Sequence, residues 1–117
     1  MALRDVSGAV DFAVLEAMTA GDDAIAEEVL GLFVQQASLW SPLLDVLEEG
    51  WRDAVHTIRG AALGIGAGAL AEVCAEAERA DKSTVAPLLD RVRTALDAAL
   101  ADVAAYRHAL MLKSLRG

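Results

Sequence analysis

Residues 51–66 read WRDAVHTIRGAALGIG, and this stretch decides the fold predicted for the chain. Its apolar side chains recur at alternating intervals of four and three, at Trp51, Val55, Ile58, Ala62 and Ile65. At about 100° per residue these positions fall within about 80° of arc, so they form one face of a helix. That spacing is typical of a seam between packed helices, and Gly64 and Gly66 are expected to end the helix.

The same alternation appears on both sides of this stretch. A last helix is predicted with Pro87 in its first turn. Its apolar residues repeat at the same intervals, at Leu89, Val92, Leu96, Ala99, Val103, Tyr106 and Leu110. Before residues 51–66, a long helix capped by Asp22 or Asp23, bent at Pro42 and ended by Gly50 is predicted to bury Ile25, Val29, Leu32, Gln36, Leu39, Leu43 and Val46. A helix starting near Ala67 is predicted to turn inward Leu70, Val73, Cys74 and Ala77.

A shorter helix is predicted from Asp11 to Thr19, with Gly21 as its stop. Its apolar residues are expected to group on one side, at Val10, Val14, Leu15 and Met18. No tandem repeat or linker divides the chain, so we expect a single all-α domain spanning residues 1–117, built as an antiparallel helical bundle.

Composition and charge narrow the classes of partner. The chain has 117 residues, is rich in Ala, Leu and Val, and carries a formal net charge of -8 at pH 7. Such a charge repels polyphosphate backbones, so we expect no nucleic acid and no membrane partner. The single cysteine, Cys74, excludes an internal disulfide and is predicted to be buried and inert. Residues 1–5 (MALRD) are charged before any apolar run, and no stretch approaches the ~20 apolar residues of a spanning helix, so a cytoplasmic protein is predicted.

His56 is the candidate functional residue. It lies roughly 130° from the centre of the apolar face, so its imidazole is predicted to face solvent. Arg59, Gly60 and Leu63 follow on the same flank. Glycine inside a helix costs about 1 kcal/mol relative to alanine, and a bare backbone at Gly60 would let another protein approach the ring. An exposed imidazole is a nucleophile near neutral pH, and Arg59 offers positive charge to phosphoryl oxygens.

Residues 56–67 read HTIRGAALGIGA, and together with Leu70 and Cys74 they closely resemble the signature of histidine phosphotransfer (HPt) domains. The resemblance covers most of the chain, from the region of Phe33 through Glu78. It implies a four-helix bundle, here an antiparallel up-down bundle with a short additional N-terminal helix. It also implies that His56 accepts a phosphoryl group from the aspartate of a receiver domain and passes it to another receiver domain, with Gly60 opening access to the ring.

Two positions depart from the family pattern. Arg59 stands where lysine is usual, which keeps the charge but is expected to shift transfer rates or partner choice. Glu78 stands where several members carry a glutamine that hydrogen-bonds near the histidine ring. A carboxylate could hold the imidazole by accepting its N–H, but it would repel incoming phosphate unless Lys82, expected one turn on, neutralises it. Glu78 and Lys82 are therefore supporting candidates.

The predicted function is that of a phosphorelay intermediate with no kinase or phosphatase activity of its own. The sequence has no glycine-rich phosphate loop and no acidic cluster arranged for magnesium, so we expect no cofactor and no metal site, with magnesium on the partner receiver domain. Expected partners are receiver domains of response regulators and a hybrid histidine kinase, docking over Leu63 and Gly64, and the resemblance implies a monomer.

Two alternatives remain open. The first is a scaffold of the same fold that binds receiver or kinase domains without phosphotransfer. The second is a metal-dependent helical enzyme, for which Asp53 and His56 supply one half of the paired ligand motif and Ala105 and His108 lack the acid of the other half. No role is assigned to His108.

Overall fold

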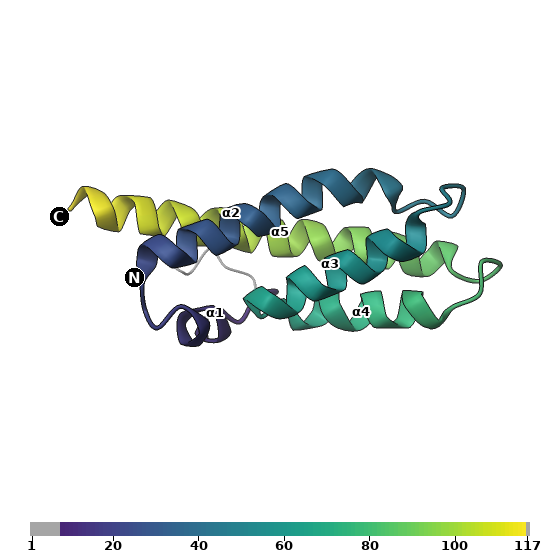
Figure 1. Cartoon of the computed structure of the whole chain (residues 1–117), viewed down its shortest axis with the longest axis horizontal. Coiled ribbons are helices and arrows are strands. Elements are labelled where there is room, and N and C mark those ends of the chain that lie inside the picture. Colours follow the sequence, from purple (N-terminus) through teal and green to yellow (C-terminus); the bar gives the residue numbers. More distant parts are fainter. Residues whose placement is uncertain (1–7, 117) are drawn as a thin grey trace.

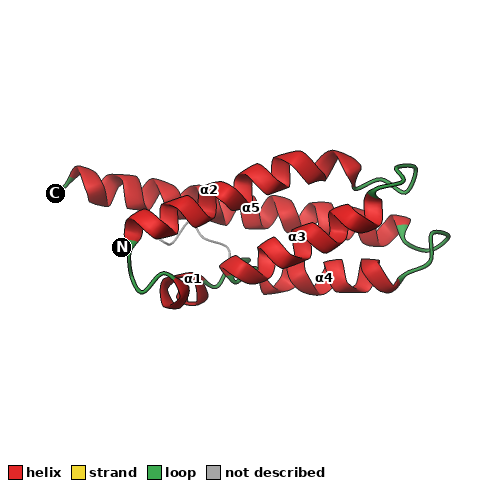
Figure 2. Cartoon of the chain, in the orientation of Figure 1, coloured by secondary structure: helices red, strands yellow, loops and turns green. Residues whose placement is uncertain are grey.

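The computed structural model describes residues 8–116, and within that range it is all-helical (Figure 2). The elements are, in chain order, α1 (Phe12–Met18), α2 (Asp23–Trp40), the short 3-10 helix η2 (Ser41–Leu43), α3 (Trp51–Ile65), α4 (Gly68–Arg79) and α5 (Ala86–Leu115). The all-α prediction is therefore confirmed for these residues. Residues 1–7 and 117 lie outside the description, and so do the prediction made from residues 1–5 and the outer limits of the domain.

Four long helices lie side by side and close into a ring of contacts (Figure 1). In that ring α2 packs against α3 and α5, α3 packs against α4, and α4 packs against α5. The molecule measures 53 × 22 × 21 Å, because α5 with its 30 residues is about 45 Å long. The smaller α1 packs on α3 at one end, where the last turns of α5 project past the other helices (Figure 1). None of the described helices is both long enough and apolar enough to cross a membrane.

The core follows the predicted seams of α3, α4 and α5. The five seam residues of α3 are each at most 5% exposed, and the seven of α5 at most 8%. The four inward residues of α4 are buried as well. Burial of this apolar surface is the main favourable contribution to folding, and it fixes which face of α3 is left for solvent.

The stripe predicted for α2 is correct only in part: Val29, Leu43 and Val46 are partly buried against the core, but three of the predicted residues face solvent. Ile25, Leu32 and Leu39 are 46%, 59% and 64% exposed. The buried face consists of Ala26, Leu30, Phe33 and Ala37. Two of these residues are alanines, which allow close helix packing but contribute little to a pattern based on side-chain hydrophobicity. The larger leucines on the exposed face therefore gave the stronger apolar periodicity.

The predicted bend at Pro42 is also wrong, because α2 ends at Trp40. Pro42 occupies the first turn of η2, where its missing N–H leaves no helical hydrogen bond unmade. Leu44 N then donates to Ser41 O at 3.1 Å, and the Leu44 side chain is 1% exposed. The chain leaves the helix at the proline and inserts an apolar residue into the core before Gly50 and α3.

The predicted apolar side of α1 is correct only in part. Leu15 and Val10 are buried, but Val14 and Met18 are 36% and 66% exposed. Phe12 takes the inward place instead, with its ring stacked on that of Tyr106 at 4.1 Å between centroids. Contact with α5 therefore sets the orientation of α1.

The end of α3 is fixed by a glycine with a positive φ. Gly66 caps α3 with φ +82°, and its carbonyl accepts a hydrogen bond from Asp11 N at 2.9 Å. A Cβ at this position would collide with the carbonyl of Asp11. Nearby, the buried Asp102 of α5 accepts a hydrogen bond from Val10 N at 3.1 Å. The N-terminal segment is thus held to both α3 and α5.

Candidate functional site

His56 lies on the face of α3 opposite the core, as its position in the sequence predicts. Its side chain is 71% exposed, while its neighbour Val55 is fully buried. The buried apolar face of α3 packs the helix onto the core, while the ring lies on the opposite face. The imidazole is therefore accessible from outside the bundle.

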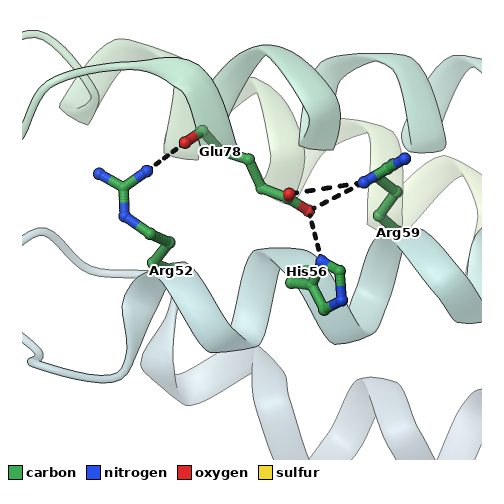
Figure 3. Close-up of polar contacts among 4 residues, drawn as sticks. All are labelled: Arg52, His56, Arg59 and Glu78. Carbon is green, nitrogen blue, oxygen red and sulfur yellow. Dashed lines mark hydrogen bonds and ion pairs between the residues drawn. The ribbon is translucent and has the colours of Figure 1, made fainter.

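The imidazole is held on one side by Glu78 of α4. His56 Nδ1 and Glu78 Oε1 are 3.1 Å apart (Figure 3). An ionised carboxylate has no proton to donate, so Nδ1 carries the proton in this pair and the tautomer is assigned from that requirement. The lone pair then belongs to Nε2, which Figure 3 shows on the side of the ring away from Glu78.

Arg59 contacts the same carboxylate. Its Nη1 lies 3.4 Å from both Glu78 Oε1 and Oε2, so the three side chains form one connected cluster on α3 and α4 (Figure 3). The side chains of Arg59 and Glu78 are 38% and 21% exposed. The predicted supporting residue Glu78 is thus brought to the ring, but the guanidinium already has an anionic partner.

Lys82 is not where the sequence analysis placed it. The prediction that it neutralises Glu78 from the next helical turn is wrong, because α4 ends at Arg79 and Lys82 lies in the exposed turn that follows. Across residues 8–116, no hydrogen bond or ion pair joins Lys82 to Glu78. Arg59 supplies the positive charge instead.

Arg52 is a site-adjacent residue that the sequence analysis missed. From the first turn of α3 its guanidinium donates to the backbone carbonyl of Glu78 (Figure 3). It also donates to the backbone carbonyl of Ala80, at 3.1 Å. It also stacks on the Trp51 ring at 4.5 Å. Arg52 therefore caps the end of α4 and fixes Glu78 relative to α3.

Gly60 leaves open space beside the ring. A Cβ there would meet no atom of another element within 4 Å, and the same holds for Gly64. Leu63 is 56% exposed. A groove of about 200 Å³ runs between α2 and α3, and it is lined by Val29, Leu32, Phe33, Gln36, Ala61, Gly64 and Ile65. The predicted docking residues thus lie on an apolar, accessible surface, and their role remains a prediction.

The other candidates for chemistry were Cys74, the possible metal-ligand motif and His108. Cys74 is fully buried, and burial, with a smaller contribution from the charge of Glu78, raises the pKa of its thiol to about 12. Within the described range, no group of three or more His, Cys, Asp or Glu side chains is arranged to hold a metal ion. His108 lies on α5 beside Arg107, and no hydrogen bond or ion pair of the described residues involves its ring.

Comparisons with known proteins agree on one family. A family model described as "Hpt domain" matches residues 28–105. The crystal structure of the histidine phosphotransferase ShpA from Caulobacter crescentus, at 1.52 Å resolution, is similar to this chain, with 55% sequence identity and a TM-score of 0.80. That match covers 92% of this chain and 99% of ShpA. No similar sequence is found among curated proteins.

Proposed function

Because this chain belongs to the Hpt domain family, we propose that it is a phosphorelay intermediate whose phosphoacceptor is His56. It accepts the phosphoryl group from the aspartate of one receiver domain and passes it to the aspartate of another. The observation that carries the assignment is the imidazole itself: exposed, anchored through Nδ1, and presenting Nε2 to solvent. Bare backbone at Gly60 gives a docking protein room beside it.

The first half of the proposed transfer needs only the lone pair of Nε2. This pair attacks the phosphorus of a phosphoaspartate in line, the P–O bond breaks, and the carboxylate of the receiver leaves with the bonding electrons. The proton on Nδ1 stays between the ring and Glu78. In the second half the next receiver's carboxylate attacks phosphorus, and the electrons of the P–N bond return to Nε2.

Arg59 is the proposed electrostatic partner of the transferred group. Its guanidinium lies one helical turn from His56, and a fork of donors suits the oxygens of a phosphoryl group. In the free protein it faces Glu78 at 3.4 Å, a long and half-exposed contact that contributes little. The arriving dianionic group competes for that guanidinium with more charge than one carboxylate carries.

The rest of the machinery is assigned to the partners. We place the magnesium expected in phosphoryl transfer on the receiver domain. As in other members of the family, the chain is proposed to be a phosphocarrier rather than a kinase or phosphatase. The proposed partners are response-regulator receiver domains and a hybrid histidine kinase, with the chain acting as a monomer.

The proposed docking surface includes Leu63, Gly64 and the apolar groove beside α2. The helix ring that carries it is interpreted as an antiparallel up-down four-helix bundle. Leu32 and Leu39, which the sequence analysis placed inside, extend the exposed apolar surface of α2. Exposed apolar surface of this kind is a common feature of protein interaction sites.

The test is transfer from a phosphorylated receiver domain. The wild-type chain is expected to acquire an acid-labile, base-stable label, and a folded His56→Ala variant is expected to acquire none. His108→Ala serves as the matched control, because it removes the other histidine without touching the cluster around Glu78. Label on the His56→Ala variant would rule out the assignment.

A second candidate function is a scaffold that binds receivers without chemistry. The observation in its favour is the carboxylate of Glu78, which occupies Arg59 and repels phosphate. A scaffold would bind a receiver equally well with or without the imidazole and would take up no label in the same assay.

A further inference from the structure

Glu78 differs from a glutamine in its negative charge, and its carboxylate contacts both His56 and Arg59. Oε1 accepts from His56 Nδ1 at 3.1 Å, and both oxygens face Arg59 at 3.4 Å. A carboxylate has about four lone-pair sites, so it can serve both donors at once. Arg52 holds the backbone of Glu78 in place, which keeps the carboxylate aimed at the ring.

The other groups around the ring do not replace this charge. On α3 they are Arg59, Arg52 and the exposed Asp53, one turn before His56. On α4, Cys74 is a neutral thiol and Glu76 is paired with Arg91 of α5 at 3.1 Å. On the α2 side, residues 29–44 contain no charged side chain. Glu78 is therefore the anion that contacts the imidazole among the described residues.

We propose that the charge of Glu78 keeps the Nδ1 proton on the ring through both halves of the transfer, so that phosphorylated His56 is a phosphoimidazolium that releases its phosphoryl group readily. This inference rests on the proposed function. Attack by Nε2 on a phosphoaspartate turns a neutral ring into a cation, and a carboxylate 3.1 Å from Nδ1 stabilises that cation. When the P–N bond breaks, its electron pair returns to Nε2 and the leaving group is the neutral Nδ1–H imidazole. No proton has to move in either direction.

Arg59 adjusts the strength of this effect. Before phosphorylation its positive charge offsets part of the carboxylate's charge. Once the phosphoryl group is attached, the guanidinium has a dianion to face, and Glu78 is left with the ring proton as its main partner. The carboxylate therefore acts most strongly on the phosphorylated state. Glu78 is a positioning residue in this account, because it acts through the imidazole.

The conservative variant is Glu78→Gln, which can accept the same hydrogen bond without the charge. Hydrogen bonds to charged groups exceed those between neutral groups by about 1 kcal/mol, so without the charge the protonated, labile form of the phosphorylated ring is about fivefold less populated relative to the unprotonated form. Glu78→Ala removes both the bond and the charge. Glu76→Gln is the matched control, since it removes one carboxylate from α4 at a position turned towards α5.

The experiment labels each protein with phosphoramidate, a small donor that needs no receiver, and follows loss of the phosphohistidine signal by ³¹P NMR between about pH 5 and pH 9. We expect Glu78→Gln to lose phosphate about fivefold more slowly than wild type near neutral pH, with its curve of rate against pH displaced to lower pH. Glu76→Gln should match wild type. In ¹⁵N spectra of the unphosphorylated ring, Glu78→Gln should keep the Nδ1–H tautomer and Glu78→Ala should lose it.

Equal or faster loss of phosphate from Glu78→Gln would overturn the role of the charge while leaving the phosphoacceptor intact. A wild-type chain that takes no label from phosphoramidate or from a phosphorylated receiver would instead overturn the proposed function itself. The two failures are thus distinguished by the wild-type sample alone.

Discussion

Replacing Gly60 by alanine is expected to make the protein more stable and a poorer phosphoryl carrier. A Cβ at this position meets no neighbouring element within 4 Å, so the added methyl group strains nothing in the free protein. Glycine in a helix interior costs about 0.5–1 kcal/mol relative to alanine. For a domain of this size the gain corresponds to a rise in Tm of about 2–6 °C.

On the proposed function, the same methyl group would occupy the space that a receiver domain needs beside His56. Overpacking a close contact costs about 1–3 kcal/mol, so transfer from a phosphorylated receiver is expected to slow by about 5- to 150-fold. Labelling by phosphoramidate should not change, because a small donor reaches Nε2 without covering Gly60. The variant therefore separates docking from chemistry.

Thermal unfolding followed by circular dichroism measures the first effect, and transfer from a radiolabelled receiver measures the second. Gly31→Ala is the matched control: it lies within α2, and its Cβ would meet the Arg107 side chain at an ordinary 3.8 Å. It should gain stability without losing transfer. A Gly60→Ala protein that transfers at the wild-type rate would show that Gly60 does not open access to His56. A variant less stable than wild type would show that the added methyl group is not accommodated in the free protein.

Three further predictions concern the framework of the site. Arg52→Ala is expected to lose about 1 kcal/mol of stability in urea, because two backbone carbonyls at the end of α4 lose their donor, and an unchanged urea midpoint would contradict this. Asp102→Ala is expected to cost about 1–3 kcal/mol, because it strands the buried N–H of Val10, and wild-type stability would show that this bond is dispensable. The Cys74 thiol should resist a thiol-specific reagent near pH 8 until the protein is unfolded, whereas prompt reaction of the folded protein would be inconsistent with its burial. Burial raises the pKa of the Cys74 thiol from 9.0 to about 12, so above pH 9 the thiol ionises more readily in the unfolded chain than in the folded protein. The contribution of the buried neutral thiol to the free energy of unfolding is therefore complete below pH 9 and is lost as the pH rises towards 12.

Periodicity predicted the site helix well because its apolar face is large and continuous. Trp51, Val55 and Ile58 bury bulky side chains at strict intervals, and the outward position of His56 follows from that face by angle alone. The same angular argument placed Arg59, Gly60 and Leu63 on the flank of α3 that carries His56. Local helical geometry is enough to relate positions that are one turn apart.

The α2 stripe could not be predicted in the same way. Its buried face contains Ala26 and Ala37, and its outer face carries Leu32 and Leu39, so side-chain hydrophobicity points to the wrong side. Only the packing of α2 against α3 and α5 decides between the two faces. The exposed leucines are then surface available to a partner rather than part of the core.

The contacts of Glu78 depend on tertiary structure that the sequence does not display. A family resemblance pointed to Glu78, but the choice of Arg59 over Lys82 as its cationic partner depends on where α4 ends. Arg52 bonds to backbone carbonyls, which every residue possesses, so no side-chain pattern signals the contact. The contact of Arg52 with α4 follows only from the packing of α4 beside the start of α3.

In the proposed phosphorelay, Nε2 of one histidine carries the phosphoryl group. The direct measurement is phosphorus–nitrogen coupling by NMR in ¹⁵N-histidine-labelled protein phosphorylated by a receiver domain, with a His108→Gln variant to assign the signals. We expect a single coupling to Nε2 of His56, with Nδ1 still protonated. Coupling to Nδ1 of His56, or to either nitrogen of His108, would contradict it.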